Sequence, residues 1–179
     1  LAVLEIVKLW YNKSMRKVNI VLFGLLFLLP SIAFSAEDLT ERLNGRILLQ
    51  VQDKGQAWYI DPVAKQRAFL GRPSDAFKIM RELGLGITNS DLLQIPTKDE
   101  TRNDSDLYQR LSGRILLQVE SNGEAWYVNP VDLRRYFLGR PSDAFEIMRG
   151  KGLGITDSDL EKVAVHEKYK EEIQESKDE

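Results

Sequence analysis

The chain has 179 residues and a nearly balanced charge, with 25 Lys and Arg residues against 27 Asp and Glu residues and a single His. It contains no Cys, which excludes disulfide scaffolds, thiolate zinc sites, iron–sulfur clusters and cysteine nucleophiles. The near-neutral balance argues against the strongly basic surface that non-specific nucleic-acid binding needs, so we expect no nucleic-acid partner. A hydrophobic content of 43% and a charged content of 29% are typical of a folded globular protein with one or two domains.

The N-terminal segment has the pattern of a secretory signal. Met15, Arg16 and Lys17 form a short basic region, and the uncharged run IVLFGLLFLL follows at residues 20–29. This run is shorter than the roughly 20 residues that a helix needs to cross the hydrocarbon core of a bilayer. We therefore expect contact with a membrane only through this segment, and only if it stays uncleaved.

Small residues after the apolar run suit cleavage by a signal peptidase. Cleavage after Ser35, with Ala33 two residues earlier, fits the small-x-small rule best. We interpret residues 15–35 as a signal peptide and residues 1–14 as an overcalled start. An exported chain without Cys suits a bacterial periplasm or exterior, so we predict a secreted or periplasmic protein.

The rest of the chain consists of two copies of one sequence repeat. A shift of 68 positions aligns residues 38–92 with residues 106–160 without a gap, and 38 of these 55 positions are identical. The stretch FLGRPSDAF, for example, recurs unchanged. Two copies are too few for a solenoid, which needs about three repeats to bury a continuous core.

We predict two small tandem modules, at residues 38–95 and 106–163. The polar, Pro-containing linker at residues 96–105 connects them, and a charged tail follows at residues 164–179. Each module has about 55 residues, which is near the lower size limit for a domain that folds alone. The sequence leaves open whether the two modules pack together.

Each module begins with a predicted β-hairpin. Asn122-Gly123 lies between two β-rich runs and is a strong signal for a two-residue hairpin loop. Such a loop places Gln118 opposite Tyr127, and period-two alternation then turns Trp126 toward the core and Tyr127 away from it. The first copy follows the same pattern around Lys54-Gly55, so Trp58 is expected inside and Tyr59 outside.

A third strand and a helix follow the hairpin. Residues 135–138 read as a strand, and Pro141 suits the first turn of a helix. Gly152 is a natural residue for the end of that helix, and Thr156 resembles an N-cap for another. The predicted fold class is therefore α+β, with two small β-β-β-α modules after the signal peptide.

No set of residues argues for catalysis. His166 lies in the charged tail and is expected to be solvated, and Asp75 and Asp143 are best explained as acidic residues in the first turns of helices. The glycine-rich residues 150–154 follow a predicted helix and not a strand, so a helix-ending turn is preferred to a phosphate loop. We predict a non-catalytic protein without cofactor or metal.

Two features keep a binding function in view. The first is the pairing of Tyr59 with Gln50 and of Tyr127 with Gln118 on the predicted outer face of each hairpin. An aromatic ring beside an amide suits a sugar or peptide ligand. The alternative is that a helix or the other module covers this face.

The second feature is a cation just before each predicted helix. Arg72 and Arg140 stand where the helix dipole disfavours positive charge. Either Asp75 and Asp143 neutralise them, or an anionic ligand shares the site.

The repeat resembles one found in exported bacterial proteins associated with the cell envelope. The resemblance is carried by the pattern GRILLQVE-x-x-GEAWYV-x-P…R-x-FLGRPSDAF-x-IMR…GLGIT-x-x-DL, and it covers residues 38–95 and 106–163. It implies a role beside cell-envelope and wall-acting enzymes. It implies no catalytic residue and no cofactor.

These observations favour a secreted, non-catalytic tandem binding module. The expected partner is a cell-envelope or extracellular ligand, either a glycan or a protein. The first alternative is a structural or assembly protein of the envelope, and the second is a hydrolase with its site between the two domains.

Overall fold

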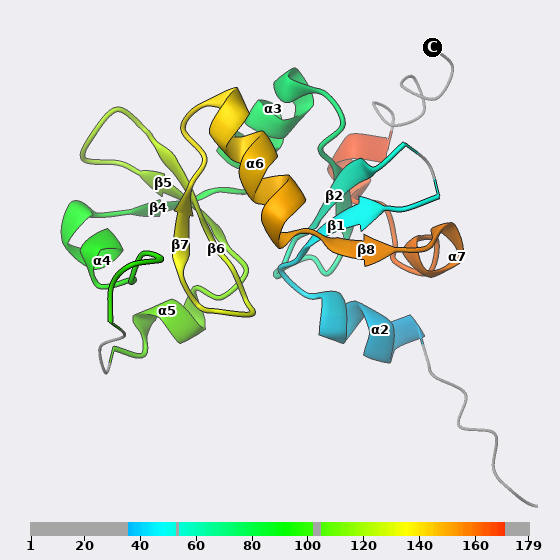
Figure 1. Cartoon of the computed structure of the whole chain (residues 1–179), viewed down its shortest axis with the longest axis horizontal. Helices are drawn as coiled ribbons and strands as arrows, with labels where there is room; N and C mark the ends of the chain where they lie inside the picture. Colours follow the sequence, from blue (N-terminus) through cyan, green and yellow to red (C-terminus); the bar gives the residue numbers. More distant parts are fainter. Residues whose placement is uncertain (1–35, 53, 102–104, 171–179) are drawn as a thin grey trace, which may run out of the picture. The chain divides into compact units, whose positions relative to one another are not determined.

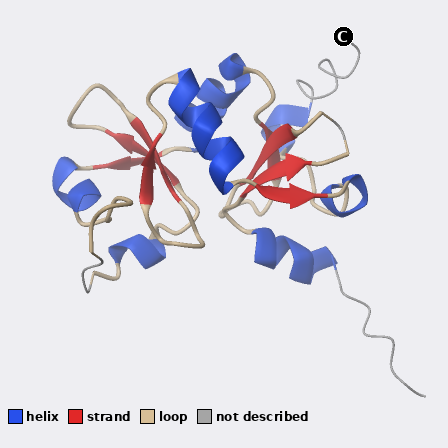
Figure 2. Ribbon diagram, viewed as in Figure 1, coloured by secondary structure: helices blue, strands red, loops and turns tan. Residues whose placement is uncertain are grey.

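A computed structural model describes residues 36–52, 54–101 and 105–170. It shows a mixed α+β structure with two four-stranded sheets and, in this part of the chain, six α-helices (Figure 2). The signal peptide expected at residues 15–35 lies outside the described residues. Among the helices that are described, none has the length and apolar character needed to cross a bilayer.

The two repeats contain the same elements in the same order. We call residues 38–95 repeat one and residues 106–163 repeat two. The elements of the first half are α2 (Ala36–Leu43), β1 (Ile47–Gln50), β2 (Gln56–Ile60), β3 (Arg67–Phe69), α3 (Pro73–Leu83), β4 (Leu85–Ile87) and α4 (Asn89–Leu93). Those of the second half are α5 (Leu107–Arg110), β5 (Ile115–Gln118), β6 (Ala125–Val128), β7 (Arg135–Phe137), α6 (Pro141–Lys151), β8 (Leu153–Ile155), α7 (Asp157–Leu160) and the 3-10 helix η1 (Glu167–Tyr169).

Each sheet takes its fourth strand from the other repeat. The strand orders are β3-β2-β1-β8 and β4-β5-β6-β7. Strand β8 of repeat two pairs in parallel with β1 of repeat one, and β4 of repeat one pairs in parallel with β5 of repeat two (Figure 1). The repeats are therefore linked by a reciprocal exchange of strands, and both lie in one compact unit.

This exchange changes the expected architecture. The prediction of separate β-β-β-α modules lacked β4 and β8, because both strands are only three residues long and lie in glycine-rich segments that resemble helix-ending turns. The question whether the two copies pack together is answered by the shared sheets.

The register of the hairpins also differs from the prediction. Leu117 pairs with Ala125, and Ile115 pairs with Tyr127, because residues 119–124 form a longer connection than the expected two-residue loop. The backbone N–H of Val119 donates to the carbonyl of Ile87 on the exchanged strand instead of extending the hairpin. A register shift by an odd number of residues moves the side chains of one strand to the other face. Tyr127 consequently shares a face with Ile115.

That face forms the central core of the molecule. It brings together buried side chains from both sheets and from α3 and α6, and its largest fully buried members include Tyr59 and Tyr127. Helix α3 of repeat one packs against β5, and helix α6 of repeat two packs against β1, so the helices cross between the repeats as the strands do.

Two glycines meet at the centre of this arrangement. Gly45 has φ +69° and Gly113 has φ +76°, a left-handed conformation that favours glycine. A Cβ atom on Gly45 would lie 2.4 Å from the Cα atom of Gly113, and the reverse distance would be 2.5 Å. The close approach of the two repeats therefore requires glycine at both positions.

The local signals for helices in the sequence are confirmed. Helices α3 and α6 begin at Pro73 and Pro141. The side chains of Thr88 and Thr156 accept hydrogen bonds from backbone N–H groups three residues later, as N-caps do.

The segment after repeat two is not a solvated tail over residues 164–170. The N–H of Arg67 donates to the carbonyl of Ala164, and the N–H of His166 donates to the carbonyl of Arg67, at 2.8 Å each. The segment thereby lies along the edge strand β3, and the ring of Tyr169 is buried. Nothing in residues 171–179 is described.

The segment between the repeats is also attached to a sheet edge. The N–H of Arg135 on β7 donates to the carbonyl of Pro96 at 2.9 Å. The side chain of Arg134 donates to the carbonyls of Thr97 and Glu100. The linker predicted at residues 96–105 is thus held in place at least up to residue 100.

Candidate functional site

The two tyrosines proposed as ligand contacts lie in the core. Tyr59 and Tyr127 each expose only 1% of their surface. The hydroxyl of Tyr59 donates to the carbonyl of Gly113 at 2.7 Å, and that of Tyr127 donates to the carbonyl of Gly45 at 2.9 Å. Burial raises the pKa of both phenols above the ordinary value. The prediction that they form an exposed stacking face is wrong, because the register turns them inward and the other repeat covers them.

The two glutamines hold the tryptophans instead of lying beside the tyrosines. The indole N–H of Trp58 donates to Gln50 at 3.0 Å, and that of Trp126 donates to Gln118 at 3.2 Å. The amide of Gln50 then donates to Asp157 at 2.9 Å, a contact that reaches the other repeat. These amides are engaged in internal hydrogen bonds and connect each sheet to the capped helix beside it.

The two arginines before the helices form the internal ion pairs that were one of the two alternatives. Arg72 lies 3.1 Å from Asp75, and Arg140 lies 2.8 Å from Asp143. Both pairs are on the surface, where an ion pair contributes about 0–1 kcal/mol to stability. Arg72 also borders a large groove.

That groove, which we call the basic groove, has a volume of about 660 Å³. It lies between the β1–β2 hairpin of repeat one, the loop after β3, and helix α6 of repeat two. Its lining consists of Leu49, Lys54, Gly55, Gln56, Ala57, Phe69, Leu70, Gly71, Arg72, Phe145, Met148 and Arg149. The groove therefore exists only because α6 packs on the sheet of the other repeat.

A stack of side chains fixes one wall of the groove. The guanidinium of Arg67 lies 5.0 Å from the ring of Trp58, and the rings of Trp58 and Phe69 are 4.9 Å apart. Phe69 in turn covers Gly71, where an added Cβ would come within 2.0 Å of the ring. Because the stack ties Phe69 to buried residues, this wall is preorganised for a ligand.

The opposite wall is formed by α6. Phe145 is 58% exposed, which is unusual for a large aromatic side chain, and the guanidinium of Arg149 lies 5.6 Å from its ring. Met148, also on α6, is buried. The wall presents an aromatic face and a cation to the same space.

Lys54 adds a third cation at the tip of the hairpin. Its backbone has φ 51°, a left-handed conformation that is uncommon for residues other than glycine. Sequence reasoning named Arg72 but missed Lys54, Phe69, Phe145 and Arg149. A signal for Lys54 was present, because position 54 is one of the few in the hairpin at which the two repeats differ.

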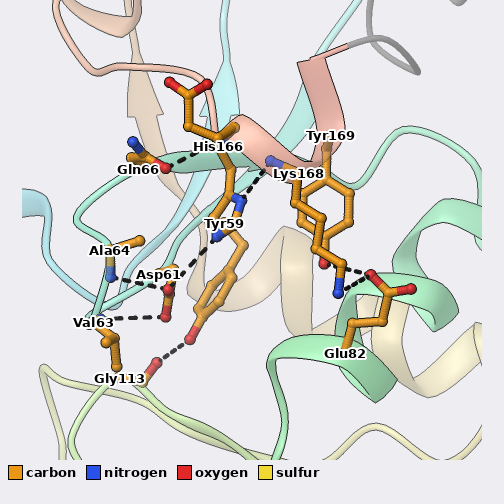
Figure 3. Close-up of polar contacts among 11 residues, drawn as sticks. Tyr59, Asp61, Val63, Ala64, Gln66, Glu82, Gly113, His166, Lys168 and Tyr169 are labelled. Atoms are coloured by element: carbon orange, nitrogen blue, oxygen red, sulfur yellow. Dashed lines mark hydrogen bonds and ion pairs between the residues drawn. The ribbon is translucent and has the colours of Figure 1, made fainter.

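His166 is the other correction. Its imidazole is only 13% exposed and lies 3.9 Å from a carboxylate oxygen of Asp61, which is itself held by the N–H groups of Val63 and Ala64 (Figure 3). Tyr169 points from the same segment to Glu82, as Figure 3 also shows. These contacts attach the C-terminal segment to repeat one.

Comparisons with family models, with curated proteins and with solved structures give no match to this chain.

Proposed function

We propose that the protein is an exported, non-catalytic binding protein that holds a cell-envelope or extracellular ligand, a glycan or a protein, in the basic groove. Export rests on the basic, apolar and small-residue pattern of residues 15–36. The envelope as location also rests on the resemblance of the repeat to that of exported bacterial proteins.

The basic groove is the single observation that carries the binding role. Its volume of about 660 Å³ falls within the range of ligand sites in proteins. It also combines an apolar floor with a few polar groups at the rim, which is the usual composition of such sites. Phe145 gives the strongest indication, because an exposed aromatic ring beside a cation is a typical anchor in binding surfaces.

A second candidate function is a structural or assembly role in the envelope. The observation in its favour is the exposure of Phe77 at 37% and Phe145 at 58%, on helices α3 and α6 that together line a small apolar pocket. An exposed apolar surface of this kind suits contact with another protein.

Retention on insoluble cell-envelope material tests the proposed function. We expect purified residues 36–179 to be retained, and the double variant Lys54→Glu, Arg149→Glu to lose most of that retention. The control carries Glu at the equivalent positions of the other repeat, through Asn122→Glu and Arg81→Glu.

The control separates the site from general charge. Both variants add two acidic residues, and the groove variant removes two cations where the control removes one, but only the first pair lies in the basic groove. Equal retention of the two variants would show that the groove is not the binding site. Export is tested separately, since N-terminal sequencing of the exported protein should begin at Ala36.

A further inference from the structure

We infer that the basic groove selects a segment of a protein ligand in which an acidic group lies beside an aromatic side chain, and that each chain binds one such segment although its fold repeats the groove's elements twice. The inference rests on the proposed function and names the ligand class of the same site.

The charge of the groove points to an anion. Lys54, Arg72 and Arg149 line it, and none of the described lining residues is acidic. The ion pair of Arg72 with Asp75 offsets one of these charges. A cleft with low-dielectric walls and one sign of charge concentrates ligands of the opposite charge.

The walls point to a flat apolar body. Phe69, at the end of β3 in repeat one, and Phe145, on α6 of repeat two, both line the groove. The floor between them is formed by side chains without charge, including Leu49, Leu70 and Met148. An aromatic or planar ligand can stack on the rings while its anionic group meets the cations at the rim.

The equivalent surface of repeat two has the same apolar residues but a different charge. Phe137 and Leu138 stand in place of Phe69 and Leu70, and α3 supplies Phe77, Met80 and Arg81 as α6 supplies Phe145, Met148 and Arg149. At the hairpin, however, Asn122 replaces Lys54, and Glu124 replaces Gln56.

This replacement removes a cation and adds a carboxylate. The carboxylate of Glu124 accepts hydrogen bonds from the backbone N–H and the side-chain amide of Asn122, at 2.9 and 3.2 Å. A hydrogen bond from its own backbone N–H, followed by those from Asn122 and Ser121, lowers its pKa below the ordinary value, so it is charged at neutral pH. An anion is therefore attracted less strongly to the equivalent surface than to the basic groove.

A pair of dyes that differ in one charged group tests the inference. The anion 8-anilinonaphthalene-1-sulfonate and the neutral N-phenyl-1-naphthylamine share the same aromatic body. With residues 36–179 we expect one sulfonate dye bound per chain, with an affinity at least tenfold higher than that of the neutral dye. Added salt should weaken the binding of the sulfonate dye and leave the binding of the neutral dye unchanged, because ions screen the charges at the groove rim.

Exchange of the hairpin residues between the two repeats sharpens the test. The variant Lys54→Asn, Gln56→Glu should lose at least tenfold in affinity for the sulfonate. The variant Asn122→Lys, Glu124→Gln should bind two sulfonate molecules per chain. All four positions are on hairpin loops or strand ends, and circular dichroism melting checks that both variants fold as the parent does.

The outcomes separate the inference from the proposed function. If both dyes bind equally and Phe145→Ala weakens both, the groove is a binding site but does not select anions, and only the inference fails. If the parent already binds two sulfonate molecules, the difference between the repeats has no effect and the inference also fails. If neither dye binds, or dye binding is unaffected by Phe145→Ala and by the hairpin exchange, the groove takes no aromatic anion and the inference fails, while retention on cell-envelope material still decides the proposed function.

Discussion

Repeat one and repeat two make the same contacts where they face each other. Tyr59 donates to Gly113 as Tyr127 donates to Gly45, and strand β8 joins β1 with the register that joins β4 to β5. At these positions each residue has to fit the sheet of its own repeat and the exchanged strand of the other. Reciprocal contact of this kind explains why the sequence is repeated so closely in the centre of the molecule.

Away from the centre, the two repeats make similar tyrosine–carboxylate contacts with residues from different parts of the chain. In repeat two the hydroxyl of Tyr136 donates to Asp132 at 2.6 Å, and Lys151 lies 3.0 Å from the same carboxylate. Repeat one has Ala68 where repeat two has Tyr136. There the C-terminal segment supplies Tyr169, whose hydroxyl donates to Glu82 at 3.0 Å.

The difference shows which positions are free to diverge. A residue in the exchanged core contacts both its own sheet and a strand of the other repeat, whereas a residue at an outer edge contacts its own repeat and the segment that follows the other repeat. The basic groove lies on the boundary between these classes, since its walls come from both repeats and its hairpin tip faces solvent. This location allows one repeat to acquire a binding surface that the other lacks.

The largest expected effect comes from separating the repeats. Residues 36–104 and 105–170, prepared as two fragments, should each lack a cooperative thermal melt as a monomer, because each sheet loses its fourth strand and each central tyrosine its cover. Mixing the fragments should restore a cooperative melt. A monomeric fragment that melts cooperatively, with a midpoint independent of concentration in a sedimentation-checked sample, would contradict this account.

The second comparison sets the two outer tyrosines against each other. Tyr136→Ala should cost about 3–5 kcal/mol of unfolding free energy, as truncation of a buried aromatic ring does. Tyr169→Ala should cost less, because residues 164–170 can detach while the sheets stay folded. Hydrogen exchange checks this distinction, since only Tyr169→Ala should expose the backbone N–H groups of Arg67 and His166. Equal exchange in both variants would mean that the segment does not unfold separately.

The central glycines provide the third comparison. Gly45→Ala and Gly113→Ala should each cost about 2–4 kcal/mol, since an added methyl group meets backbone and a positive φ strains the alanine. Gly55→Ala is the matched control, because it has φ +70° with no atom within 4 Å of the added Cβ, and should cost about 1 kcal/mol. Chemical denaturation measures all three, and a Gly45→Ala loss no larger than that of Gly55→Ala would show that the repeats can separate at this point.

Much of this fold was accessible from the sequence because it is encoded locally. The strand at residues 135–137, the helix that begins at Pro141 and the threonine caps depend on neighbouring residues, and each is present. The pairing of Arg72 with Asp75 is equally local. Such features follow from propensity and capping without knowledge of the rest of the chain.

The features that sequence reasoning missed all depend on distant parts of the chain. Strand β8 has only three residues and becomes a strand through its pairing with β1, which lies about a hundred positions earlier. That pairing takes up the N–H of Val51, lengthens the hairpin connection and shifts its register. The shift turns Tyr59 inward and so removes the predicted ligand face. The basic groove was missed for the same reason, since Phe145 reaches repeat one only through the crossed helices.

The pH dependence of stability offers a fourth test of the symmetric core. The pKa values of Tyr59 and Tyr127 are raised in the folded protein, so their contribution is complete below about pH 10 and is lost as the pH rises above the pKa of an unfolded tyrosine. Each buried phenol should lower the free energy of unfolding by up to about 1.4 kcal/mol per pH unit between pH 10 and 12.

The variants Tyr59→Phe and Tyr127→Phe resolve this loss into its two parts. Each should cost about 1–3 kcal/mol at pH 7, because a buried carbonyl loses its donor. The two variants should also reduce the loss of stability per pH unit at alkaline pH equally, because each removes one of the two buried phenols. Urea melts at pH 7 and pH 11 measure both quantities. A marked inequality between the two variants would break the symmetry inferred for the core.

The smallest expected effect concerns the edge at which the repeats differ most. Glu82 accepts a hydrogen bond from Tyr169 and lies 2.9 Å from the ammonium of Lys168, while the equivalent residue of repeat two is Gly150. The hydrogen bond from Lys168, with that from Tyr169, holds the pKa of Glu82 below its ordinary value. The carboxylate therefore adds stability above about pH 4.5, and this contribution is lost as the pH falls through the lowered pKa. Because Lys168 is largely exposed, Glu82→Gln should cost less than about 1 kcal/mol at pH 7, and the difference from the parent should shrink as the pH falls through the lowered pKa of Glu82.

Gly150→Glu is the control for that measurement. It places the same carboxylate on α6, where no atom lies within 4 Å of the new Cβ, and the helix propensity of glutamate should stabilise the protein by up to about 1 kcal/mol. This gain should not depend on pH between 3 and 7, because neither a tyrosine nor a lysine of a docked segment is described beside α6 at this position. If urea melts show the same acid dependence for both variants, the effect comes from general surface charge and not from the C-terminal segment. A pH-dependent loss confined to Glu82→Gln would identify that segment as part of the folded structure of repeat one, where it replaces a tyrosine that repeat two carries on its own third strand.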